Sequence, residues 1–162
     1  MKLFLSTFLF CLISQTTLAQ IEEKAGNKHA FGIIYGSTTG NGIGYRYHPS
    51  KLGIQFAFQP KFDKENHDIY SGISLLYRVT ENEKVNFLLF NGHRVHFSNN
   101  YTYSPVDGVT ETVDSEYNLG FGVGLELIMF KRLSLNLMTG YGAFDNFERI
   151  NFSGEFSLLY RI

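Results

Sequence analysis

Apolar residues alternate with small or polar residues through most of this chain, and the longest such run covers residues 117–130 (YNLGFGVGLELIMF). A period of two indicates a β-strand with one apolar face, whereas the three glycines would weaken the interior of a helix. About 12 steps of roughly 3.3 Å give a strand of about 40 Å. Tilted by about 40°, it would span an apolar band of roughly 25–30 Å, the hydrocarbon thickness of a bilayer.

The same alternation recurs along the rest of the chain and predicts eight strands, with the phase left open only in the apolar middle of the fifth (FLLFN). The predicted strands are residues 29–38, 42–48, 52–59, 69–79, 85–97, 117–130, 133–141 and 152–162. Short turns (HPSK, TENEK, FKR) alternate with longer connections, except that the first connection is also a short turn (TGNG). Residues 98–115 are predicted as a long polar loop. In an antiparallel arrangement this places short turns and both termini at one end.

The first residues predict export. Lys2, an apolar core and a small-residue site before Gln20 are typical of a cleaved secretory signal peptide over residues 1–19. Residues 20–28 are polar and are expected to form a flexible N-terminal lead, followed by one β-barrel domain over residues 29–162. The only cysteine, Cys11, lies in the signal peptide, so the processed chain would have no disulfide.

Composition agrees with alternating strands. The chain holds 16 Phe, 10 Tyr and 16 Gly, yet its mean hydropathy is only −0.09. With 14 Lys and Arg against 15 Asp and Glu, it has no basic surplus, so no nucleic-acid partner is expected. After the signal peptide, no apolar segment is long enough for a spanning helix, which excludes a helical membrane protein.

These patterns predict an all-β fold, an eight-stranded antiparallel up-and-down transmembrane β-barrel. An eight-stranded lumen is filled by side chains. Its predicted charged residues are Arg46, Arg78, Arg94, Glu126, Glu155 and Arg161. Because unpaired buried charges are costly, we expect a plug in which the two glutamates are shared among the arginines; a gated ion path is the alternative. No cofactor or metal is expected, since His93 and His96 point to opposite faces of a strand.

The chain resembles the small eight-stranded outer-membrane β-barrel family, which includes the membrane domain of outer membrane protein A. The resemblance lies in the signal peptide, the run of residues 117–129 and the last strand, EFSLLYRI, where Ser157 and Ile162 replace the usual Gly and Phe. It implies a monomer in the outer membrane of a Gram-negative cell envelope. The implied partners are outer-membrane lipids and, during biogenesis, the barrel-insertion machinery.

Two alternatives remain open from the sequence. Residues 96–99 (HFSN) resemble the His-aromatic-Ser-Asn segment of outer-membrane lipid A deacylases, in which His96 would be the base for a Ser98 nucleophile, oriented by Glu111 or Glu116. A secreted lipocalin-like ligand-binding barrel would have the same strand count but apolar residues inside.

The favoured functional expectation is a non-enzymatic, porin-like barrel with a plugged lumen. It would display extracellular loops for envelope integrity or partner contact, and residues 98–115 are the expected contact surface.

Overall fold

The computed structural model describes residues 28–63, 66–104 and 108–162, so the predicted signal peptide and all of the N-terminal lead except Lys28 lie outside the described residues. The strands are β1 (His29–Gly36), β2 (Gly40–Tyr47), β3 (Leu52–Phe62), β4 (Asn66–Arg78), β5 (Val85–Ser104), β6 (Gly108–Met129), β7 (Leu133–Phe144) and β8 (Arg149–Arg161). The described residues contain no helix that is long and apolar enough to cross a membrane.

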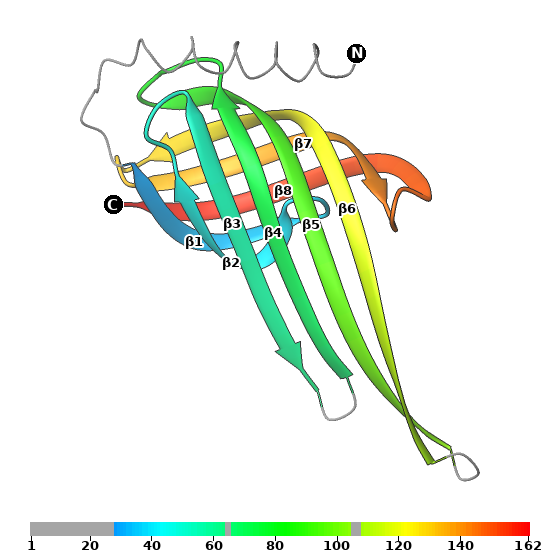
Figure 1. Cartoon of the computed structure of the whole chain (residues 1–162). Helices are drawn as coiled ribbons and strands as arrows, with labels where there is room; N and C mark the ends of the chain where they lie inside the picture. Colours follow the sequence, from blue (N-terminus) through cyan, green and yellow to red (C-terminus); the bar gives the residue numbers. More distant parts are fainter. Residues whose placement is uncertain (1–27, 64–65, 105–107) are drawn as a thin grey trace, which may run out of the picture.

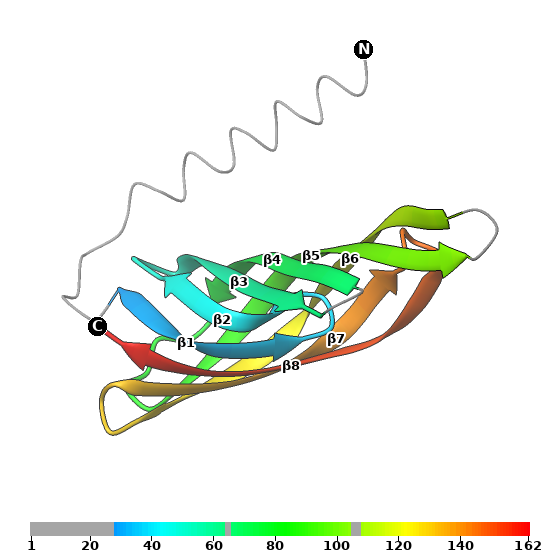
Figure 2. The same ribbon diagram turned by 90° about the horizontal axis from the view of Figure 1, so that it is seen from below.

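The eight strands form one closed barrel in sequence order (Figures 1 and 2). Each strand pairs antiparallel with the next, and β1 closes the sheet against β8 through pairs such as Phe31 with Tyr160. Closure leaves no free edge in the body of the barrel. The predicted eight-stranded up-and-down barrel is therefore confirmed as the fold.

The apolar face of each ribbon points outward. On β6, Phe121 and Val123 expose 64% and 55% of their surface, while Asn118 and Glu126 expose 4% and 2%. On β5, where the sequence left the phase open, Phe87 and Leu89 are exposed and the intervening apolar residues are buried. Most large apolar residues of the described strands face outward and most of the buried residues are polar, which is the reverse of the arrangement that a lipocalin-like barrel requires.

The two ends of the barrel differ, and we name them by their connections. The turn end carries the β2–β3, β4–β5 and β6–β7 connections and both ends of the barrel chain, as the sequence predicts. The hairpin end carries the other four connections. At the turn end, the β6–β7 turn places Phe130 and Lys131 at φ angles of 50° and 65°, the left-handed conformation that a tight reversal requires.

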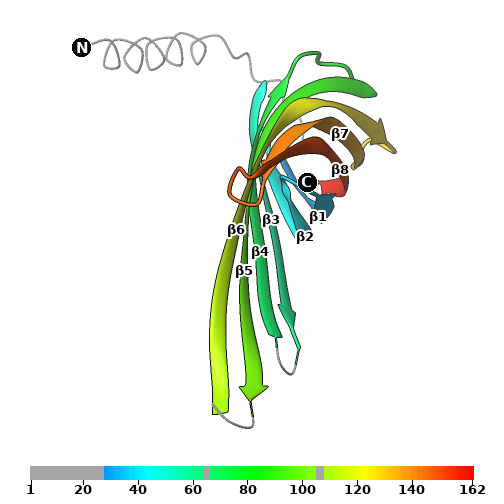
Figure 3. The same ribbon diagram turned by 90° about the vertical axis from the view of Figure 1, so that its right-hand side faces the viewer.

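The prediction of a long loop over residues 98–115 is wrong. β5 continues to Ser104 and β6 starts at Gly108, with the ladder unbroken from Ser98–Asp114 to Ser104–Gly108. The segment is rich in Tyr, Thr and Val, which favour strands, but it has no apolar alternation that would have identified it. Figure 3 shows β3–β6 running far beyond β1 and β2, so that at the hairpin end the sheet projects from one side of the barrel only.

The β1–β2 turn folds into the lumen instead of extending from it. It consists of Ser37–Thr38–Thr39 rather than the predicted TGNG, and both threonines are 1% exposed. A Cβ on Gly120 would lie 2.2 Å from Thr38 Oγ1, and one on Gly72 would lie 2.2 Å from the Thr39 carbonyl oxygen. The inward glycines thus leave the space that this turn occupies.

The remaining differences lie at strand ends. β3, β4, β7 and β8 are each longer at the hairpin end than predicted: β4 starts at Asn66, β7 ends at Phe144 and β8 starts at Arg149. Polar residues in these extensions hide the period of two, whereas pairing with a neighbouring strand supplies the hydrogen bonds that hold them.

Candidate functional site

A buried polar network surrounds Glu126 in the lumen near the turn end. Its carboxylate accepts from Arg46 Nη1 and Arg78 Nη2, both at 3.3 Å, and from Asn86 Nδ2 and Ser134 Oγ, both at 2.9 Å. The side chains of Arg46 and Glu126 are each 3% exposed. Five different strands supply these groups, so the network ties opposite walls of the barrel together.

Arg46 uses all of its guanidinium nitrogens. Nε and Nη2 donate to Gln55 Oε1, and Nη1 also donates to Asn136 Oδ1 at 2.7 Å. Gln55 in turn donates to Glu155 Oε1 at 3.0 Å. The predicted sharing of a glutamate between arginines thus occurs at Glu126, whereas Glu155 joins the network through the amide of Gln55. We call these groups, with His48, the lumen network: Arg46, His48, Gln55, Arg78, Asn86, Glu126, Ser134, Asn136 and Glu155.

His48 follows β2 and closes the network at the turn end. Its Nδ1 accepts from Arg78 Nη2 at 3.1 Å, so its Nε2–H donates to the Lys51 carbonyl oxygen at 3.2 Å. This arrangement requires the neutral ring. Burial, and next the positive charge of Arg78, lower the pKa of His48 to about 4.

Apolar side chains fill much of the remaining lumen. One buried cluster joins Ala30, Ile34, Ala57 and Leu159, and another joins Leu76, Leu88, Phe90 and Met138. Inward glycines make room for them; a Cβ on Gly44, for example, would lie 2.1 Å from Ile34 Cδ1. Apolar side chains offer an ion no replacement for its water shell, so these clusters oppose conduction.

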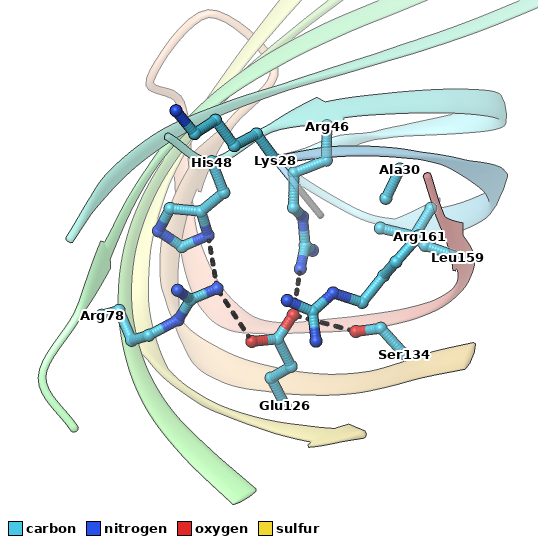
Figure 4. Close-up of a pocket in the computed structure, with 9 residues that line it drawn as sticks. All are labelled: Lys28, Ala30, Arg46, His48, Arg78, Glu126, Ser134, Leu159 and Arg161. Carbon is cyan, nitrogen blue, oxygen red and sulfur yellow. Dashed lines mark hydrogen bonds and ion pairs between the residues drawn. The ribbon is translucent and has the colours of Figure 1, made fainter. Parts of the chain in front are cut away.

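Of the other predicted charged residues, Arg94 lies apart from Glu126, whereas Arg161 lines the same cavity as Glu126 (Figure 4). Arg94 is near the hairpin end, where its Nη1 donates to the Ser37 carbonyl oxygen at 3.2 Å and its guanidinium stacks over the Tyr70 ring. Arg161, at the end of β8, lines a cavity at the turn end together with Arg46 and Arg78.

His96 and Ser98 meet carboxylates beyond the inserted turn. His96 Nε2 lies 3.2 Å from Asp68 Oδ1 and its Nδ1 lies 3.5 Å from Glu116 Oε2. Ser98 hydrogen-bonds to Asp68. With a carboxylate at each ring nitrogen, His96 has no nitrogen directed to take the Ser98 proton, so this geometry is not that of a Ser–His dyad. The Glu111 side chain lies outside the described residues.

Sequence reasoning missed the neutral partners of the charges and the role of Asp68. Gln55, Asn86 and Asn136 are 0–2% exposed. Their inward phase was readable from the alternation, but the register that pairs them was not. The predicted strand starts only at residue 69, whereas β4 already includes Asp68.

The hairpin end also presents an unpaired strand edge. β6 pairs with β7 only from Leu119 onward, so within the described chain its residues from Gly108 to Asn118 have no strand on that side. The β7–β8 turn covers the end of this edge: Asn146 exchanges hydrogen bonds with the Tyr117 backbone, and its Nδ2 donates to the Ser115 carbonyl oxygen. Edges of this kind can accept an added strand.

No family model and no curated protein matches this sequence. Among solved structures, the N-terminal β-barrel domain of Pseudomonas aeruginosa OprF matches with a TM-score of 0.54 at 10% identity, over 85% of this chain and 98% of that chain. Ail of Yersinia pestis gives 0.39 at 19% identity, and Neisserial surface protein A gives 0.42 at 15% identity; each covers 83% of this chain and 93% of its own. The OprF likeness shows that the chain has the fold of an eight-stranded outer-membrane barrel.

Proposed function

We propose that this chain is a non-enzymatic integral protein of a Gram-negative outer membrane, exported by a cleaved signal peptide, with a closed lumen and a projecting β5–β6 hairpin that contacts a partner outside the cell. The observation that carries the proposal is the inside-out barrel, with apolar side chains around its exterior and charged groups within. A protein surface of this kind needs lipid around it. Lipids are therefore its first partners, and a monomer buries this surface without a second subunit.

Membrane placement is tested by fractionating cells that express the full chain. We expect the processed chain in the outer-membrane fraction, resistant to extraction by alkaline carbonate and released by detergent. Recovery of folded protein from the aqueous fraction would contradict the placement. The same preparation tests export, because N-terminal sequencing of the processed chain should start at Gln20. Dependence on the barrel-insertion machinery is tested by depleting that machinery, which should leave the chain unfolded in the periplasm.

The packed lumen supports the plug over a gated path. The lumen network, the two apolar clusters and the inserted β1–β2 turn all occupy it. Purified protein in planar bilayers should therefore give no reproducible open state of large conductance. A variant with Thr38 and Thr39 both changed to Gly, which removes the side chains of the inserted turn, is the matched test of whether they contribute to closure.

The carboxylate contacts of His96 support the non-enzymatic proposal. Purified protein should release no fatty acid from lipid A, and Ser98→Ala should change nothing. Hydrolysis abolished by Ser98→Ala would overturn this part and restore the deacylase alternative.

Partner contact through the hairpin rests on the free β6 edge. An extended segment of another protein could pair with this backbone, with Val113, 66% exposed, beside it. Replacing residues 99–113 by a two-residue turn should leave the barrel folded. Whole cells that display this variant should no longer capture the partner. Removing only residues 104–108 is the control, because it shortens the hairpin while leaving most of the edge. Equal capture by cells with the wild-type protein and with each of the two variants would exclude the hairpin as the contact surface.

A further inference from the structure

The unpaired edge of β6, the outermost strand of the projecting sheet in Figure 3, has a defined set of backbone groups that face away from the sheet. Tyr117 shows which ones, because its carbonyl oxygen accepts from the Asn146 N–H and its own N–H donates to Asn146 Oδ1. Successive residues of a strand direct their N–H and C=O groups to opposite sides, and β6 pairs with β5 without interruption from Gly108 onward. Ser115, Val113 and the alternate residues before them therefore direct their backbone groups away from β5, and within the described chain no strand pairs with them.

The two faces of the sheet beside this edge differ in chemistry. One face continues the exterior of the barrel and carries Ile69, Phe97 and Val113, which expose 36%, 48% and 66% of their surface. The other face continues the lumen and carries the exposed residues Asp114 and Glu116. Apolar side chains thus border the edge on one face, and carboxylates border it on the other.

The carboxylates nearest the edge are poorly compensated. Asp114 forms no ion pair within the described chain. Glu116 has only His96, whose Nδ1 lies 3.5 Å from Glu116 Oε2 and whose other ring nitrogen faces Asp68. Lys61 lies on β3, three strands from the edge, with its Nζ 3.9 Å from Asp68. A negative potential therefore remains beside β6, and it favours cationic side chains in whatever pairs there.

The pattern of an added strand follows from these two faces, because its side chains alternate as those of β6 do. On the luminal face they stand opposite Asp114 and within diagonal reach of Glu116, where Lys or Arg is favoured; on the other face they stand beside Val113, where an apolar side chain is favoured. A second copy of the chain is a poor match. Antiparallel pairing of two β6 edges places Asp114 and Glu116 of both copies on one face, where like charges repel.

We infer that the β6 edge binds an extended segment of another protein in which basic residues alternate with apolar ones. This specificity rests on the partner contact proposed above and names the chemistry of the partner. Backbone pairing with alternate residues from Val109 to Ser115 holds the segment, and the two faces of the sheet select its side chains.

Short synthetic peptides with blocked ends test this specificity on the full processed chain, folded in uncharged maltoside micelles. One peptide alternates Lys and Val, a second alternates Glu and Val, and a third has the composition of the first with all Lys residues in one block. At low ionic strength, fluorescence anisotropy should show the Lys/Val peptide binding about tenfold more tightly than either of the others. When it is bound, the Val113 N–H should exchange more slowly with solvent, whereas the Asp114 N–H, which faces β5, should not change.

Variants separate the contribution of charge from that of backbone pairing. Asp114→Asn combined with Glu116→Gln should remove the preference for the Lys/Val over the Glu/Val peptide. Glu81→Gln combined with Glu83→Gln is the matched control, because it removes the same charge from an exposed turn at the other end of the barrel and should leave the preference unchanged. Val113→Pro should abolish binding, because proline offers the added strand no N–H, while at this position it breaks no hydrogen bond to β5.

Equal binding of the Lys/Val and Glu/Val peptides, binding of neither, or unchanged exchange at Val113 would overturn the inferred chemistry. So would slow exchange at Val113 in a dimer of the protein alone, because a second copy would then occupy the edge. The whole-cell test of the shortened hairpin would still decide the contact itself, so the two proposals fail separately. Exchange at Val113 in the wild-type protein needs no variant, so a poorly folding variant leaves the test intact.

Discussion

Glu126 compensates two arginines inside the barrel. Its carboxylate bonds to Arg46 and Arg78 and also accepts from two neutral side chains. Removing one partner of a buried ion pair leaves the other charge without compensation, at a cost of about 3–5 kcal/mol. The stability of this part of the lumen therefore depends on a single carboxylate.

Glu126→Gln should lower the free energy of unfolding by about 3 kcal/mol, because it keeps the size of the side chain and removes its charge. Urea unfolding in micelles measures the effect. Glu83→Gln, an exposed residue in the β4–β5 turn, is the control and should change stability by less than about 0.5 kcal/mol. Similar small losses for both variants would mean that the ion pairs contribute little.

His48 makes stability depend on pH. Its pKa is lowered to about 4 in the folded barrel, from an ordinary value of 6.5. Between these values the unfolded chain binds more protons, so stability should fall as pH falls from about 6.5 to about 4. The contribution lost is at most about 3 kcal/mol. Unfolding of wild type and His48→Gln at pH 4.5 and 7.5 tests this, and the variant should show a smaller difference between the two pH values.

At the scale of elements, the β1–β2 turn and the glycines around it form one packing unit. Gly40 and Gly42 have φ angles of 93° and 106°, which other residues rarely adopt, and they let the chain re-enter β2 from inside the lumen. The glycines of four other strands then face Thr38 and Thr39. The short first connection is thus part of the packing that fills the lumen.

Gly120→Ala should destabilise the barrel by about 1–3 kcal/mol, because its Cβ would overlap Thr38 Oγ1. Adding Thr38→Gly should recover part of this loss, since the three atoms nearest to the new methyl group all belong to the Thr38 side chain. Gly154→Ala is the matched control, because nothing lies within 4 Å of a Cβ there. Thermal unfolding of wild type, Gly120→Ala, Thr38→Gly, the double variant and Gly154→Ala provides the comparison, and additive effects in the double variant would exclude the contact.

For the whole molecule, the decisive property is which part of the exterior touches lipid. Val123 and Val113 are both on β6 and are 55% and 66% exposed, yet only Val123 lies in the body of the barrel, where β7 pairs with β6. Val113 lies on the projecting hairpin. Because the two side chains are similarly exposed, comparing substitutions at these positions separates the effect of lying within the membrane from the effect of exposure alone.

Val123→Arg should destabilise the protein folded into lipid vesicles by about 2–4 kcal/mol, whereas Val113→Arg should change its stability by less than about 0.5 kcal/mol. Reversible denaturant unfolding in vesicles measures both. Equal effects at the two positions would place the membrane boundary elsewhere on β6.

The sequence by itself determined the strands inside the apolar band, because a period of two survives wherever one face meets an apolar environment. The pattern of residues 117–129 therefore indicated both that the segment is a strand and which of its residues face inward and outward. Beyond the band, as in residues 98–115, both faces are polar, and only pairing between β5 and β6 decided that the chain stays extended. Tertiary structure also decided the charge partners. Arg46 and Glu126 are 80 residues apart, and they meet because barrel closure, with its fixed strand register, brings distant strands to one level of the lumen.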